Sequence, residues 1–129
     1  MTAMMRTRVF GFVISIAALL CGCAENEEEA FCTEEFRSVT LLVPGDSLTK
    51  SYTVRLSTSD TIRYPQSPGF GGNHNVYVVL NDTYQPKLKG EVDNFRFIGE
   101  RAGKVVISED YVIKADHCHI TKVSGKSEL

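Results

Sequence analysis

A two-residue period in the hydrophobic side chains, broken by turn signals, constrains the fold of this chain more than any other feature. From Glu35 onward apolar and polar residues alternate over short runs, which is typical of strands with one buried face. Pro44–Ser47 and Arg101–Lys104 carry the glycine and proline chemistry of tight turns. The core-facing residues predicted for the first two strands are Val39, Leu41 and Val43, and then Tyr52, Val54 and Leu56.

The pattern predicts about seven short strands and no amphipathic helix. The strands are expected at 36–43, 50–56, 61–64, 76–82, 94–100, 104–116 (one bent strand or two short ones) and 117–123. We therefore expect an all-β fold, a small antiparallel sandwich of Ig-like or transthyretin-like type, after an N-terminal signal helix.

Length and charge limit the number of domains and the kind of partner. With 129 residues the chain holds one small domain, and its formal net charge is -2. Twelve basic and ten acidic residues follow Phe36, so the domain has no strong positive field. We expect no nucleic-acid partner.

The N-terminus has the layout of a secretion signal. A basic stretch with Arg6 and Arg8 precedes Val9–Leu20, an apolar run of twelve residues. As a helix this run would span about 18 Å, against about 30 Å of bilayer hydrocarbon. The alternative, a buried core helix, has no helical partner later in the sequence.

Leu20–Cys23, the sequence LCGC, resembles the lipobox of bacterial lipoproteins. The resemblance implies cleavage before Cys23, a diacylglyceryl group on its sulfur and acylation of its new amino group. Cys21 is the weaker acceptor because Leu20 would then occupy a small-residue position. The predicted organisation is a signal peptide at 1–22, a lipidated cysteine and acidic tether at 23–34, a β-sandwich at 35–125 and a tail at 126–129.

The residues after Cys23 bear on location. Ala24 resembles the residue that sends lipoproteins to the outer membrane, and the acids of Ala24–Ala30 resemble surface-export signals of Bacteroidota lipoproteins. A plain polar spacer facing the periplasm is the alternative. Tyr111–Gly125 resembles the closing segment of small Bacteroidota lipoproteins, and the whole pattern resembles transthyretin-like or carboxypeptidase-regulatory-like sandwiches.

Two cysteines remain after processing, Cys32 and Cys118. In an oxidising compartment they are expected to form a disulfide that brackets the domain. Two free buried thiols are the alternative. Their spacing is not a zinc signature.

His117 and His119 are the most suggestive residues for chemistry. On a strand they would share a face, with Cys118 pointing the other way, and both imidazoles would face solvent. They could bind zinc or copper, with His74 as a third ligand. The simpler interpretation is an exposed polar pair, so we expect no metal and no cofactor.

Other candidates are weaker. Pro68–Asn75 is glycine-rich but lacks the residues of a phosphate loop, so Phe70 is a candidate partner-binding residue on a loop. Ser47 and Thr61 sit in short motifs that resemble Bacteroidota O-glycosylation sites, in predicted exposed turns. Glu109 and Asp110 are read as solvated turn residues.

No spacing of nucleophile, base and acid predicts a hydrolase, so the chain is not expected to be an enzyme. The leading prediction is a lipid-anchored cell-envelope protein at the outer membrane, periplasmic or surface-exposed. It would act as a non-catalytic binding or structural module for protein or glycan. The alternatives are a small metal-binding or metalloenzyme domain using His117 and His119, and an accessory subunit of an outer-membrane complex.

Overall fold

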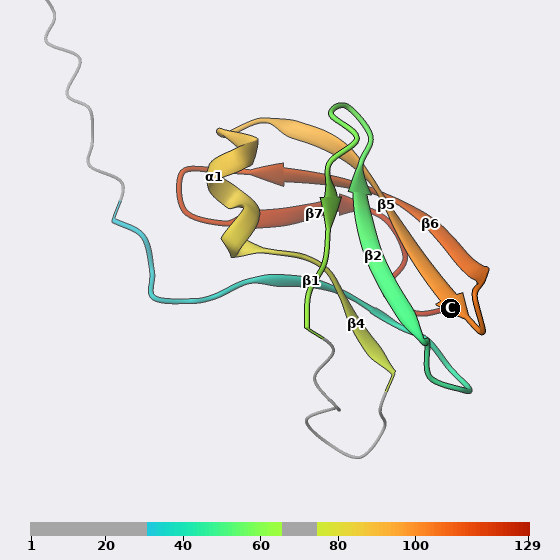
Figure 1. The fold of residues 1–129 in the computed structure, drawn as a ribbon. Helices are drawn as coiled ribbons and strands as arrows, with labels where there is room; N and C mark the ends of the chain where they lie inside the picture. The colour runs from blue at the N-terminus through green and yellow to red at the C-terminus, as the bar shows by residue number, and fades with distance from the viewer. Residues whose placement is uncertain (1–30, 66–74) are drawn as a thin grey trace, which may run out of the picture.

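The computed structural model of the protein describes residues 31–65 and 75–129. The predicted signal peptide, Cys21 and Cys23 lie outside these ranges, as do Phe70 and His74. The elements are β1 (Ser38–Leu42), β2 (Lys50–Arg55), β3 (Thr61–Ile62), β4 (Val76–Asn81), η1 (Asp82–Tyr84), α1 (Gln85–Leu88), β5 (Val92–Arg101), β6 (Lys104–Ala115) and β7 (Ile120–Ser124) (Figure 1).

The seven strands form two antiparallel sheets, which confirms the predicted small all-β sandwich. One sheet pairs β1 with β4, and the other has the order β3-β2-β5-β6-β7. The long hairpin of β5 and β6 is its centre. The hairpin turns at Ala102 and Gly103, whose φ angles are 49° and 78°. A two-residue hairpin turn of this kind needs positive φ, which the glycine of the predicted turn adopts readily.

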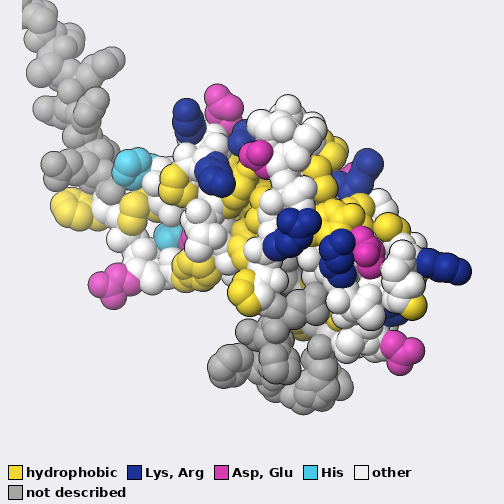
Figure 2. Space-filling model, in the orientation of Figure 1, with side chains coloured by type: hydrophobic (Ala, Val, Ile, Leu, Met, Phe, Trp, Pro, Cys, Tyr) yellow, Lys and Arg dark blue, Asp and Glu magenta, His cyan; other side chains and the backbone are white. Residues whose placement is uncertain are grey.

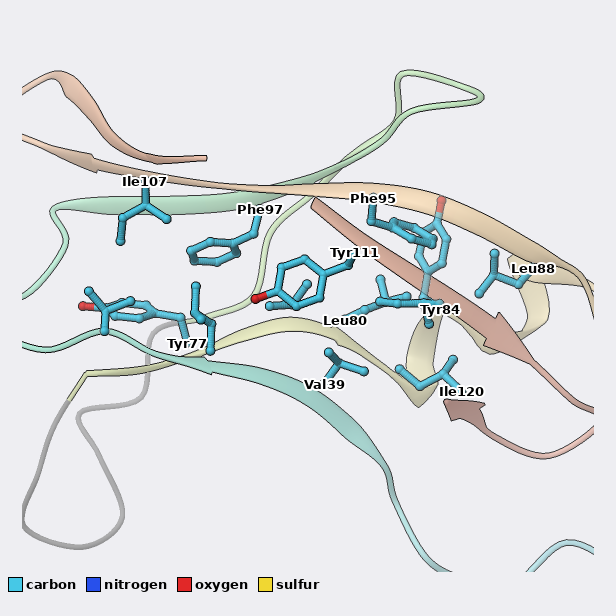
Figure 3. Packing of buried hydrophobic residues seen from close by; sticks show 14 of the residues in the cluster. Val39, Tyr77, Leu80, Tyr84, Leu88, Phe95, Phe97, Ile107, Tyr111 and Ile120 are labelled. Atoms are coloured by element: carbon cyan, nitrogen blue, oxygen red, sulfur yellow. The ribbon is translucent and has the colours of Figure 1, made fainter. Parts of the chain in front are cut away.

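The core lies between the two sheets (Figure 3). Val39, Leu41 and Val43 are buried on the β1 side, as predicted. The five-stranded sheet contributes its large residues from alternate positions, as the pleat demands. The largest fully buried side chains are Tyr111, Phe95, Phe97, Leu41, Leu80 and Leu88.

The prediction of which β2 side chains face the core is wrong. Thr53 is buried, whereas Tyr52 and Val54 are only partly buried and Leu56 is exposed. The Thr53 hydroxyl donates to the buried carbonyl of Val79 across the sandwich, at 2.6 Å. Outside, the Tyr52 ring lies under the cations of Lys50 and Arg63. The hydrogen-bonded Thr53 hydroxyl and the two cation–π contacts of Tyr52 thus stabilise an orientation of β2 opposite to the one that hydrophobicity alone predicts.

A short helical segment replaces the predicted linker after β4. Asn81 caps η1 by accepting from the N–H of Thr83, and Pro86 lies in the first turn of α1. Lys89 and Gly90, both with positive φ, end the helix. This segment buries Tyr84 and Leu88 against the end of the sandwich.

The chain beyond β7 packs against β1. The N–H of Leu42 donates to Ser127 O, and the N–H of Leu129 donates back to Leu42 O. The Tyr111 hydroxyl also donates to Lys126 O, at 2.9 Å. The segment predicted as a tail is therefore paired with the sheet.

Candidate functional site

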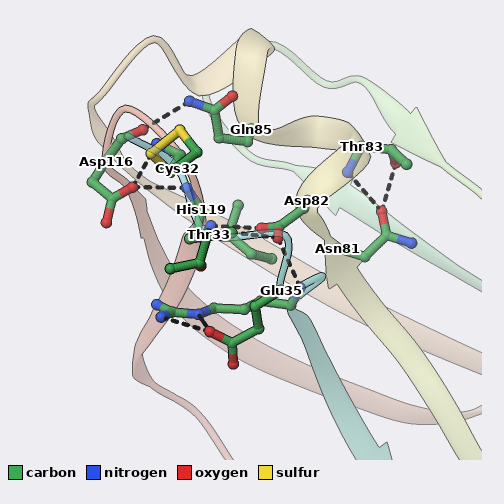
Figure 4. A network of polar contacts seen from close by, with 12 residues as sticks. Cys32, Thr33, Glu35, Asn81, Asp82, Thr83, Gln85, Asp116 and His119 are labelled. Carbon is green, nitrogen blue, oxygen red and sulfur yellow. Dashed lines mark hydrogen bonds and ion pairs between the residues drawn. A yellow bond between two sulfur atoms is a disulfide. The ribbon is translucent and has the colours of Figure 1, made fainter. Parts of the chain in front are cut away.

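Cys32, Cys118, His117 and His119, four of the residues predicted to carry chemistry, lie at one end of the sandwich. There the segment before β1, the helical segment and the β6–β7 loop meet (Figures 1 and 4). Cys32 and Cys118 form a disulfide across this end, with their Cα atoms 5.3 Å apart. The predicted pairing of these cysteines is confirmed.

The Asp82 carboxylate is the centre of this end. It accepts the backbone N–H of Arg37 at 2.7 Å and that of Ile120 at 2.8 Å. The His119 Nδ1 lies 2.8 Å from the same carboxylate. Burial alone would raise the pKa of Asp82, but the hydrogen bonds from Arg37, Ile120 and His119 outweigh it and hold that pKa below its usual value. Asp82 therefore joins the N-terminal segment to β7 through an ionised carboxylate.

The prediction that His117 and His119 share a solvent-facing strand face is wrong. Residues 117–119 form a loop before β7. His119 is buried, and His117 is exposed. The loop is fixed by Asp116, whose side chain accepts the N–H groups of Cys118 and His119, both at 2.7 Å. This capping by a carboxylate turns the chain before the strand can begin.

Thr33, His119 and Asp82 are connected in the order of a hydrolytic triad. The Thr33 hydroxyl lies 3.0 Å from Nε2 of His119, and Nδ1 faces Asp82. The backbone N–H groups of Arg37, Cys118, His119 and Ile120 donate to the carboxylates of Asp82 and Asp116. These bonds tie the N-terminal segment to β7 and shape the β6–β7 loop, which makes the arrangement a structural clamp.

The contacts of His119 bear on the metal alternative. Both ring nitrogens of His119 have protein partners, so that imidazole is not free to bind a metal. No group of three or more His, Cys, Asp and Glu side chains suited to a metal ion occurs within residues 31–65 and 75–129.

A second buried ionic cluster connects β2 to β5. Asp93, on β5, accepts from Arg55 Nε at 2.5 Å and from the Ser57 hydroxyl. Burial opposes ionisation of Asp93, but the hydrogen bonds from Ser57, Arg55 and Asn94 hold its pKa below the usual value. Among the described residues, no buried side-chain nitrogen or oxygen lacks a hydrogen-bond partner, and a buried ion pair needs such partners to be stable.

A polar groove separates β1 from β7. It has a volume of about 450 Å³. Its lining includes Arg37, Ser38, Thr40, Thr121, Lys122 and Ser127. This groove could not be predicted, because its walls come from opposite ends of the domain sequence and neither wall carries a motif.

The remaining predicted residues have simple surroundings. Ser47 is exposed in its predicted turn and donates to Asn75 Oδ1 at 2.9 Å. Thr61 is exposed at the start of β3 instead of in a turn. Glu109 and Asp110 lie inside β6, not in a turn, and pair with Lys126 and Arg96 respectively.

Together the fold and these contacts define a small disulfide-closed β-sandwich. No family model, curated protein sequence or solved structure matches the chain. None of the helices in the described part of the chain is long and apolar enough to span a bilayer. Positive and negative side chains are interspersed on the face drawn in Figure 2.

Proposed function

We propose that this chain is a lipid-anchored protein of the cell envelope, with its lipid on Cys23 and its β-sandwich acting as a non-catalytic binding or structural module. The Cys32–Cys118 disulfide carries the proposal. Disulfides persist in oxidising compartments, outside the cytoplasm. A secreted chain with a lipobox-like LCGC would meet this condition.

The position of the disulfide also suits an anchored domain. Cys32 lies nine residues after Cys23, so the covalent link sits close to the proposed lipid. Together with the Asp82 hydrogen bonds it fixes the anchor-bearing segment to the β6–β7 loop. Two or three acyl chains on one cysteine would hold the domain at the bilayer, since each buried methylene contributes about 0.8 kcal/mol.

Cys23→Ser tests the anchor. The expected result is loss of the lipid, with the protein either released from membranes or retained with its signal peptide. Membrane fractionation and intact mass measure both. Cys21→Ser is the matched control and should leave processing and membrane association unchanged. A processed Cys23→Ser protein that still sediments with membranes would refute the anchor.

The binding-module role is favoured over metal chemistry by the burial and full hydrogen bonding of His119. Metal analysis of the purified full-length protein separates the two. Stoichiometric zinc or copper that is lost in His117→Ala would establish the metal alternative.

A further inference from the structure

Phe31 is the most exposed large apolar side chain that the structure describes. Its exposed fraction is 92%, and that of Phe36, in the same segment, is 60%. The other two described phenylalanines, Phe95 and Phe97, are fully buried in the core. A phenyl ring left in water forgoes the free energy that burial of its apolar surface would release. Phe31 is therefore a candidate contact residue.

The residues that follow Phe31 fix its position. Cys32 is covalently bonded to Cys118 in the β6–β7 loop, and the Thr33 hydroxyl lies 3.0 Å from His119 Nε2. These two contacts hold the backbone next to Phe31 against the sandwich. The described chain begins at this end, beside α1 and the β6–β7 loop (Figure 1), and Figure 2 shows hydrophobic side chains there.

The length of the preceding chain favours the bilayer as the partner of this ring. Phe31 lies eight residues after Cys23, the proposed lipid site. An extended chain covers at most about 3.6 Å per residue, so the Cα atom of Phe31 stays within roughly 29 Å of that cysteine. A tether of this length keeps the effective concentration of the membrane surface high at Phe31.

The charges near Phe31 indicate which force would act. Glu34 is exposed in the same segment, and Lys87 and Lys89 are exposed in and just after α1, at the same end of the sandwich (Figure 1). Charges of both signs at one end give no strong field toward anionic lipid. The hydrophobic effect on the phenyl ring is then the main driving force.

We propose that Phe31 inserts into the boundary between the headgroups and the acyl chains of the bilayer. The end of the sandwich that holds the Cys32–Cys118 disulfide would then rest on the membrane. Apolar side chains at such interfaces reach about 5–10 Å into this boundary. The inference rests on the proposed lipid at Cys23 and adds a second, noncovalent contact that orients the domain.

A single Trp reports on the insertion, because the sequence contains none. The full-length lipidated protein carrying Phe31→Trp is reconstituted in phosphatidylcholine vesicles whose acyl chains are brominated near the headgroup. Bromine quenches an indole that it contacts, so Phe31→Trp should lose about half or more of its emission. The control is Val105→Trp, a 58% exposed apolar position on the β5–β6 hairpin at the other end, which should lose little (Figure 1).

A second set of variants tests whether Phe31 orients the domain. His117 is exposed in the β6–β7 loop, so His117→Trp reports on the distance of that loop from the acyl chains. Quenching of His117→Trp should fall clearly when Phe31→Ser is added and should stay unchanged when Val105→Ser is added. Both serines replace exposed side chains, so the denaturant midpoint should stay at its wild-type value.

Lipid composition separates apolar insertion from charge attraction. Quenching of Phe31→Trp should be the same after phosphatidylglycerol is added to the vesicles or salt to the buffer. Quenching that requires anionic lipid, or that is lost in salt, would assign the contact to the lysines and overturn the role of Phe31.

Two further outcomes would overturn the proposal. Emission of Phe31→Trp that stays at the wavelength of indole in water would show a ring that remains in solvent. Blue-shifted emission without bromine quenching would show a ring covered by protein, such as a second copy of this chain. Vesicle flotation distinguishes these failures from failure of the anchor. Protein that floats without quenching refutes only the insertion, whereas protein that does not float refutes the anchor and the insertion with it.

Discussion

Asp82 shows how a single side chain can organise one end of a small domain. Its carboxylate takes two backbone N–H groups from segments more than 80 residues apart and one imidazole. A buried donor left without a partner costs about 1–3 kcal/mol, so the two backbone groups make this carboxylate hard to replace. The role was not predictable, because Asp82 ends the predicted strand 76–82 and its partners Arg37 and Ile120 lie far from it in the sequence.

Asp82→Asn is expected to lower the free energy of unfolding at pH 7 by about 2–3 kcal/mol, because the amide cannot accept all three donors. The folded-state pKa of Asp82 is lowered, so its contribution is complete above the unfolded value of about 3.9 and is lost as pH falls through the folded value. The difference between wild type and variant should therefore shrink below about pH 4.

Denaturant unfolding followed across this pH range gives the measurement. Asp46→Asn, at an exposed turn position, is the control and should change stability little. Equal stability of Asp82→Asn and wild type at pH 7 would contradict the proposed clamp.

Thr53→Val tests the observed face of β2. It leaves the carbonyl of the fully buried Val79 without its donor and should cost about 2 kcal/mol in unfolding free energy. Thr49→Val removes a similar bond, to Glu100 O, at an exposed site where water can replace the hydroxyl. It should cost less than about 0.5 kcal/mol. Comparable losses in the two variants would mean that Thr53 is not the buried residue.

The strands could be predicted from the sequence, whereas the buried face of β2 and the helical segment could not. β1 followed the simple pattern because the residues that it buries, Val39 and Leu41, are both apolar. In β2 the buried face depends on contacts of Thr53 with Val79 and of Tyr52 with Arg63, which the alternation within the strand does not reveal. The seven residues of η1 and α1 are too few to show a helical period. His117–His119 is too short to distinguish a strand from a loop without Asp116 as its cap.

The segment before β1 depends on the disulfide for its place. Cys32 and Cys118 are 86 residues apart, and closing a loop of that size corresponds to about 4–5 kcal/mol as an upper figure. Reduction should therefore lower the denaturant midpoint clearly. The double variant Cys32→Ala with Cys118→Ala should match the reduced protein and show no response to reductant. An unchanged midpoint on reduction would show that the bond does not form or does not stabilise the domain.

At the scale of the whole molecule, the described N-terminal segment and the C-terminus lie toward different ends of the sandwich (Figure 1). The N-terminal segment joins the body at the end that holds α1 and the β6–β7 loop, whereas the C-terminus lies toward the other end (Figure 1). A lipid on Cys23 would thus place the Asp82 end of the sandwich nearest the bilayer.

The intact mass of the mature protein purified from cell membranes is the most direct test of the anchored-module account. The account predicts a chain that starts at Cys23, carries two or three acyl chains on that residue and contains one disulfide. A mature chain with another first residue, or one without fatty acid, would contradict it.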